Sequence, residues 1–178
     1  PTQVLHHPPH PTLLTRPFRS KKADLETVNT IYRDGFEDEA HLARYLEETS
    51  GGLMLAAGRA LGGMSAEVAR DAGFAAGLAQ FLRAVPELES HGRVPLVDGR
   101  PEAVAALARE GLARLATARK GLGAVPRPAR AALLAGWQAG PLLRQAAAEP
   151  GRVAAGALEL SEFRRRAGLM LAALTGRI

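Results

Sequence analysis

Two aspartates four residues apart, Asp34 and Asp38, have the spacing with which carboxylates share one face of a helix. Paired carboxylates of this kind hold Mg²⁺, which prefers oxygen ligands. Gly35 and a predicted turn separate the two side chains here, so we expect them to point in different directions. We therefore predict that the acidic stretch 36–39 caps a helix and complements its macrodipole, in preference to binding a metal.

A second group of metal-ligating side chains, His6, His7 and His10, lies in a proline-rich stretch at the start of the sequence. Prolines at this density are incompatible with a helix and leave no fixed scaffold for ligands. We predict that residues 1–21 form an extended arm and that these histidines bind no metal. Residues 22–178 are predicted to form one helical domain.

Several reaction classes find no support in the sequence. The chain has no cysteine, which excludes a disulfide framework, a thiol nucleophile and a thiolate metal site. It contains no nucleotide-binding glycine motif, no hydrolase nucleophile elbow and no zinc-protease motif. His41 and His91 have no Ser, Cys or Asp partner in an ordered motif, so neither is predicted to be a catalytic base.

The composition indicates an all-α protein with a core of small side chains. Hydrophobic residues make up 47% of the 178 residues but aromatic residues only 4%. The net charge of +5 favours acidic partners or an anionic lipid surface, and a solvated arginine-rich surface is the preferred interpretation. Nucleic acid is not predicted as a partner because aromatic stacking residues are scarce. The sequence contains no apolar run of 18 residues, so no transmembrane helix is predicted.

The periodicity of apolar residues and the breakers between them predict the helices. They are expected over 22–32, from about 37 to 61, from Ser65 to an end or kink at Pro86, over 101–121, from about 126 onward with a kink or division at Pro141, and from a cap at Ser161 to Thr175. Residues 88–96 are expected to form a loop.

Two of these helices have a predicted buried face. In the helix after Ser65 it consists of Val68, Phe74, Leu78, Phe81, Leu82 and Val85. In the final helix, Phe163, Met170, Leu171 and Leu174 are expected to point inward and residues 164–166, all arginine, outward.

The segment Gly73–Leu96 resembles the second signature of the squalene/phytoene synthase family, which reads roughly Q-(L/F)-x-N-(I/L)-L-R-D-x-x-x-D-x-x-x-G-R-(V/I)-Y. Residues 80–83, Gln-Phe-Leu-Arg, and residues 92–94, Gly-Arg-Val, match this signature. The two aspartate positions fall on Ala84 and Leu88, and the tyrosine position falls on Pro95. The segment 45–54 also resembles the family, in which a tyrosine precedes a run of small residues beside the prenyl tunnel. The resemblance covers residues 22–178 and corresponds to the later part of a family domain.

The resemblance implies a scaffold of the isoprenoid-synthase type without the metal-dependent chemistry. Active members use magnesium to neutralise a diphosphate leaving group, and neither alanine nor leucine can bind the ion. It therefore implies no catalytic residue and no metal ligand, and magnesium only if the protein is an enzyme after all. The remaining pocket residues that the resemblance implies are Tyr45, Gln80, Arg83, Glu87 and Arg93.

The roles of these pocket residues differ. An arginine fork suits phosphate oxygens, so Arg83 and Arg93 could hold an anion, but ion pairing with Glu87 and Glu89 is the preferred prediction. Gln80 fits equally well as a polar pocket lining or as a core amide.

The family includes non-catalytic relatives, among them assembly factors of mitochondrial respiratory complex I, and residues 82–86, Leu-Arg-Ala-Val-Pro, look more like those relatives. The resemblance therefore implies an accessory or assembly protein that binds a membrane protein complex. It would work in the cytoplasm or a mitochondrial-matrix-like compartment, peripheral to the membrane. The alternatives are a magnesium-dependent prenyltransferase, and a protein that binds an isoprenoid without chemistry.

Overall fold

The computed structural model describes residues 35–176, and every regular element in this range is a helix. The elements are α2 (Glu39–Leu46), η1 (Glu47–Gly51), α3 (Gly52–Ala60), α4 (Ala66–Ser90), α5 (Pro101–Gly121), η2 (Leu122–Ala124), η3 (Pro128–Gly136), α6 (Ala139–Ala148), α7 (Gly151–Ala154) and α8 (Glu162–Thr175). The predicted all-α class is confirmed for these residues, whereas the isoprenoid-synthase-like bundle stays a prediction. The arm at 1–21, the helix expected at 22–32 and Asp34 lie outside the described residues.

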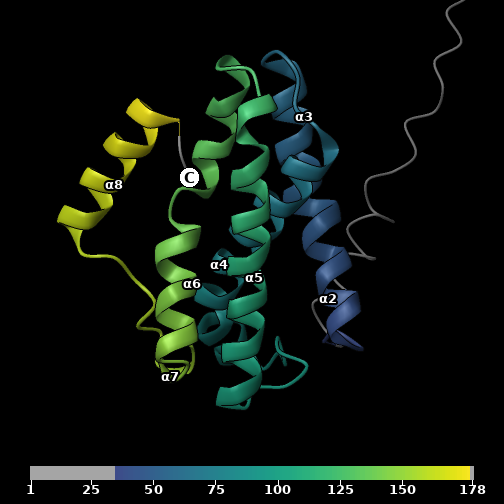
Figure 1. The fold of residues 1–178 in the computed structure, drawn as a ribbon. Coiled ribbons are helices and arrows are strands. Elements are labelled where there is room, and N and C mark those ends of the chain that lie inside the picture. The colour runs from purple at the N-terminus through teal and green to yellow at the C-terminus, as the bar shows by residue number, and fades with distance from the viewer. Residues whose placement is uncertain (1–34, 177–178) are drawn as a thin grey trace, which may run out of the picture.

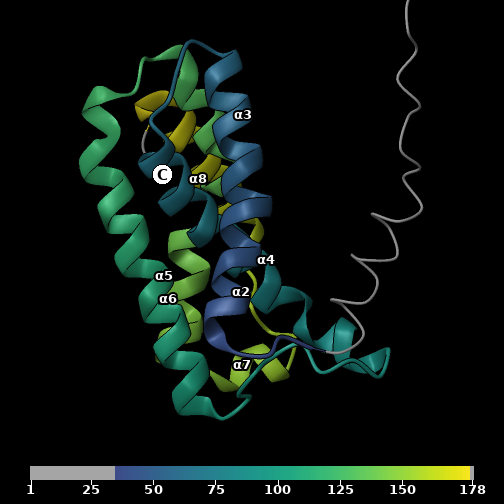
Figure 2. The same ribbon diagram turned by 90° about the vertical axis from the view of Figure 1, so that its right-hand side faces the viewer.

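Helix α4 is the centre of the bundle. It packs against α5 and α6 on one side and against η1, α3 and η3 on the other (Figures 1 and 2). The helix begins where predicted, because the Ser65 hydroxyl accepts a hydrogen bond from the Val68 backbone N–H at 3.3 Å. All six side chains of its predicted buried face are buried. Burial on nearly every side explains why small residues, alanine and glycine, fill so much of this helix.

Two glycines one turn apart, Gly73 and Gly77, allow α4 to cross η1 at close range. A Cβ atom on Gly73 would lie 2.6 Å from the Gly51 nitrogen and 2.8 Å from the Ser50 carbonyl oxygen. A Cβ atom on Gly77 would lie 2.5 Å from the Ser50 hydroxyl oxygen. At Gly73 the crossing is therefore backbone against backbone, and no larger residue fits there without a shift of one helix. At Gly77 the α4 backbone meets the Ser50 side chain.

The helical rod of α2, η1 and α3 is continuous across Gly51 and Gly52, as expected from its apolar spacing. The Asp38 carboxylate accepts a hydrogen bond from the His41 backbone N–H at 2.6 Å, so the predicted capping role is confirmed for this residue. The sequence did not predict that η1 is π-helical. Such turns often lie at functional sites.

Arg114 ties three helices together on the face of α5 that meets α4. Its Nη1 lies 2.5 Å from Glu47 Oε1 on η1 and 3.5 Å from Asp71 Oδ1 on α4. Its guanidinium carbon stands 4.4 Å from the centre of the Phe74 ring. Burial opposes the charge of Arg114, but the hydrogen bond and attraction to Glu47 outweigh it, and the pKa of the guanidinium rises.

Helix α5 spans 101–121 as predicted, with Pro101 in its first turn. The residues before it form a bend in which the Arg100 side chain donates to Asp98 Oδ2 at 2.6 Å. This hydrogen bond lowers the pKa of the Asp98 carboxyl. The division predicted at Pro141 lies a few residues earlier, at Trp137 and Gln138, and α6 runs through Pro141. The helical segment that starts at Pro128 is divided into η3 and α6, and Pro141 lies in the first turn of α6.

Pro86 does not end α4, and the expected loop at 88–96 is partly wrong. The helix continues to Ser90, with Leu88 still packed against the core. Pro86 removes one backbone donor, but burial of Val85 on one side and Leu88 on the other holds the helix together across it.

We expect Pro86→Ala to raise the free energy of unfolding by about 1 kcal/mol, since the helix recovers a hydrogen bond and loses an unfavourable ring. The gain is held below the full proline penalty of ~3 kcal/mol, because the unfolded chain becomes more flexible. Urea unfolding followed by circular dichroism measures it. A less stable variant would show that the ring itself is needed, through its contact near Gly156.

The predicted inward face of α8 is wrong, although the helix has the predicted cap and the predicted end. Phe163 is 81% exposed and Leu174 82% exposed, and Met170 and Leu171 are also mostly exposed. Helix α8 stands at the edge of the molecule (Figure 1) and contacts the bundle chiefly through η3. The three arginines at 164–166 are exposed, as expected.

Candidate functional site

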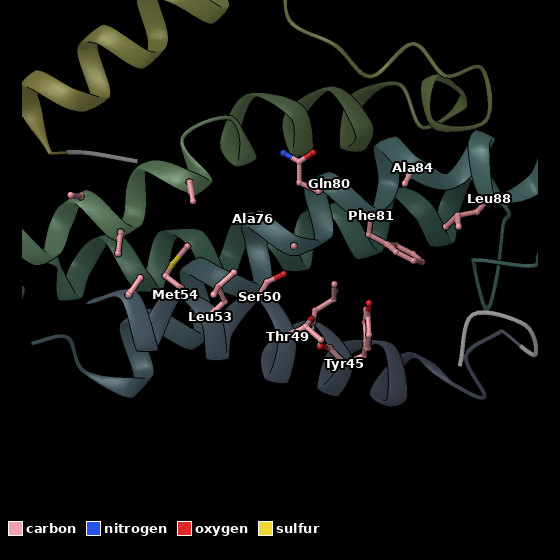
Figure 3. Close-up of a pocket in the computed structure, with 16 residues that line it drawn as sticks. Tyr45, Thr49, Ser50, Leu53, Met54, Ala76, Gln80, Phe81, Ala84 and Leu88 are labelled. Carbon is pink, nitrogen blue, oxygen red and sulfur yellow. Dashed lines mark hydrogen bonds between the residues drawn. The ribbon is translucent and has the colours of Figure 1, made fainter. Parts of the chain in front are cut away.

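A large apolar groove runs along α4 on the side that faces α2, η1 and α3. Its volume is about 870 Å³, within the range of small-molecule sites. Four successive turns of α4 form one wall, and the α2–η1–α3 rod forms the other (Figure 3). Three alanines of η3, at 131, 132 and 135, complete the groove at one end. Because the alanine side chains are small, they do not fill the space between the helices, and this space is the groove.

Two of the five predicted pocket residues line this groove. Tyr45 lies on the wall formed by α2, and Gln80 lies on α4 (Figure 3). Ala84 and Leu88 also line the groove, on the turns of α4 that follow Gln80. The two positions that carry aspartate in the resembled family therefore present a methyl and an isobutyl group to one shared cavity. Nothing at these positions could bind a cation.

The other three predicted pocket residues do not line the groove. Arg83 and Glu87 are exposed on α4. The predicted ion pair of Arg83 with Glu87 or Glu89 is wrong: Arg83 Nη1 instead donates to Gln80 Oε1 at 3.3 Å. Glu87 lies 3.5 Å from the His91 ring, with which it pairs when the histidine is protonated.

Arg93 lies close to the end of the groove without reaching into it. It lines a small adjoining cavity together with Phe81 and Leu88, both of which also line the groove. Its backbone N–H donates to the Leu88 carbonyl at 3.1 Å, which closes the end of α4. The groove itself is apolar.

Aromatic rings close the end of the groove near Arg93. The Phe36 ring lies 5.4 Å from the Tyr45 ring and 5.7 Å from the Phe81 ring, the latter in an edge-to-face arrangement. Since Phe36 precedes α2, Tyr45 is on α2 and Phe81 is on α4, the three rings fix the distance between the two walls.

Two polar groups of the groove have hydrogen-bond partners within the protein. The Thr49 hydroxyl donates to the Tyr45 carbonyl at 2.6 Å, and Gln80 Oε1 accepts from Arg83. Ser50 is packed against Gly77 at the helix crossing. The groove thus offers apolar surface with few polar groups directed at a ligand, which suits a hydrocarbon better than a charged molecule.

Sequence reasoning missed most of the wall opposite α4 and all of η3. The groove is also lined by Thr49, Leu53 and Met54. They belong to the segment 45–54, which resembles the part of the family beside the prenyl tunnel, but none of them is predicted as a site residue. The alanines of η3 carried a weak signal, namely small residues at positions one and four apart on a helical segment.

None of the described helices is long and apolar enough to cross a membrane. No protein family, curated protein or solved structure matches this chain.

Proposed function

We propose that the protein is a non-catalytic accessory protein that binds a flexible hydrocarbon chain, of the isoprenoid class, in the groove between α4 and the α2–η1–α3 rod. The observation that carries this proposal is the position of Ala84 and Leu88 in the groove. A family enzyme needs carboxylates there to hold magnesium against a diphosphate. Apolar side chains at both positions favour binding of a hydrocarbon and provide no ligand for magnesium.

The accessory role on a membrane protein complex is carried over from the family resemblance of residues 82–86. It is tested by isolating the protein under gentle lysis and identifying what accompanies it. Recovery of the free monomer alone would count against this role without affecting the hydrocarbon proposal.

Calorimetric titration with geranylgeraniol and with geranylgeranyl diphosphate, each with and without Mg²⁺, tests the hydrocarbon proposal. We expect the alcohol and the diphosphate to bind with similar affinity, and Mg²⁺ to have no effect. Binding of the diphosphate alone, dependent on Mg²⁺, would favour the prenyltransferase alternative. No heat with either ligand would contradict the proposal.

Replacing Ala84 with phenylalanine is expected to weaken binding of geranylgeraniol at least tenfold, because the ring fills the groove beside Gln80. The matched control is Ala106→Phe, which adds the same ring at an exposed position of α5 outside the groove. Thermal unfolding of both variants separates loss of binding from loss of folding. Equal affinity of the two variants would place the ligand elsewhere.

A further inference from the structure

Helix α8 carries a strip of large apolar side chains that no described residue covers. Phe163, Met170 and Leu174 are seven and four residues apart, so they lie on one face of the helix. They are 81%, 65% and 82% exposed. We call these three residues the outer strip. Leu169 and Leu171 flank it and are also exposed.

The opposite side of α8 fixes the direction in which the outer strip points. A Cβ atom on Gly168 would lie 2.7 Å from the Trp137 ring, so the helix backbone rests directly on that side chain. Ala172, one turn further, is buried. This contact through small residues holds α8 against the bundle at the edge of the molecule (Figure 1) and leaves the outer strip uncovered. Phe163 and Leu174 also border cavities that α8 shares with α6 and η3, but both side chains are more than 80% exposed.

Positive charge accompanies the outer strip. Arg164, Arg165 and Arg166 are exposed on the first turns of α8. Arg166 is one turn after Phe163 and one turn before Met170, so it lies beside the outer strip, and Arg164 borders the cavity that α8 shares with α6. Arg165 is on the face of Gly168 and Ala172, which meets the bundle. Glu162 is the single acidic residue of the helix, and it binds Arg165 at 2.5 Å and Arg166 at 2.6 Å. Three arginines and one glutamate leave the helix with two net positive charges. An exposed helix with a large apolar face and arginines beside it is typical of helices that lie in a membrane interface.

We propose that α8 docks the protein on an anionic lipid bilayer, with the outer strip in the boundary between headgroups and acyl chains and with Arg164 and Arg166 at the lipid phosphates. The sign of the charge selects this occupant over a second copy of the chain. Two copies would bring together two α8 helices that each carry two net positive charges, whereas each arginine near an anionic bilayer is attracted to it. The docking goes beyond the groove and does not depend on it.

Sedimentation with lipid vesicles tests the docking. The protein is expected to bind vesicles of phosphatidylcholine and phosphatidylglycerol, to bind pure phosphatidylcholine vesicles more weakly, and to be released from the anionic vesicles as salt is raised. Absence of binding to the anionic vesicles would overturn the proposal. Equal binding to both lipids would overturn the role of the arginines.

The double variant Phe163→Gln and Leu174→Gln is expected to lower the partition coefficient at least tenfold, with thermal stability unchanged because both side chains are exposed. Val94→Gln, which alters an exposed apolar residue far from α8 in the sequence, is expected to bind like the native protein. Binding of geranylgeraniol should be the same in all three proteins, which separates failure of the docking from failure of the groove proposal. A native dimer in analytical ultracentrifugation that the double variant converts to monomer would overturn the docking in favour of a second copy.

Discussion

Replacing Gly73 with alanine is expected to lower the free energy of unfolding by about 3 kcal/mol, although it adds only one methyl group. The methyl carbon would meet the backbone of Gly51 and Ser50, 2.6 Å and 2.8 Å away. Flexible side chains can yield to such a contact, but backbone atoms of a packed helix move only with the whole helix. Because α4 is the centre of the bundle, a shift against η1 also disturbs the groove.

Urea unfolding of Gly73→Ala, compared with Gly52→Ala, measures this effect. Gly52 lies on the facing rod, one residue beyond the crossing, and a methyl group there meets no atom within 4 Å. Alanine at position 52 is therefore expected to stabilise the helix by about 0.5–1 kcal/mol. If the two glycine-to-alanine substitutions change the free energy of unfolding in opposite directions, the close crossing limits stability and the glycine content does not. If Gly73→Ala leaves the free energy of unfolding unchanged, the close crossing of α4 and η1 is refuted.

Replacing Arg114 with methionine is expected to lower the free energy of unfolding by about 2 kcal/mol. Methionine retains the apolar stem, so the loss reports the charge contacts with Glu47 and Asp71, both of which are about three-quarters buried. Removal of the guanidinium leaves two carboxylates close together and partly desolvated. The expected loss of stability is smaller than for a fully buried ion pair, because water still reaches the three side chains.

Arg109→Met is the matched control for Arg114→Met, since Arg109 is exposed on the same helix and makes no ion pair among residues 35–176. It should change the free energy of unfolding by less than about 0.5 kcal/mol. If both variants are equally stable, the link between α5, η1 and α4 carries no net energy. If Glu47→Gln restores part of the loss in Arg114→Met, the penalty comes from the Glu47 carboxylate, whose remaining partner is Arg70 at 3.8 Å.

Helix starts could be predicted from the sequence because they depend on residues within one turn. The Ser65 and Ser161 hydroxyls and the Asp38 carboxylate each accept from a backbone N–H three residues further on. Pro101 fits a first turn for an equally local reason. Pro86 misled the prediction, because whether a helix survives an internal proline depends on packing that lies outside the local sequence.

The outer strip of α8 could not be predicted, because periodicity shows that a helix has an apolar face but not what that face meets. Inward orientation was the natural expectation for Phe163 and Leu174. The contact between Gly168 and Trp137 decides the opposite orientation, and those residues are 31 positions apart in the sequence.

The site could be predicted in part. Tyr45 and Gln80 line the groove, and so do the substituted positions 84 and 88. The charged residues Arg83 and Glu87 lie on the same helix as the groove residues of α4 but outside the face that lines the groove. A motif match by itself does not show which face of the helix a residue occupies.

Helix α8 can separate from the bundle without unfolding it. Its attachment is narrow, through η3 and the Trp137 side chain, whereas α4 contacts α5, α6, η1, α3 and η3. Local opening of α8 therefore requires only a fraction of the global free energy of unfolding, and its amide hydrogens should exchange with solvent far sooner than those of α4. Among residues 35–176, limited proteolysis should cut first in the non-helical connection at 155–161. We therefore expect α8 to open independently of the other described helices, and binding of α8 to a surface to slow its hydrogen exchange while the exchange of α4 remains unchanged.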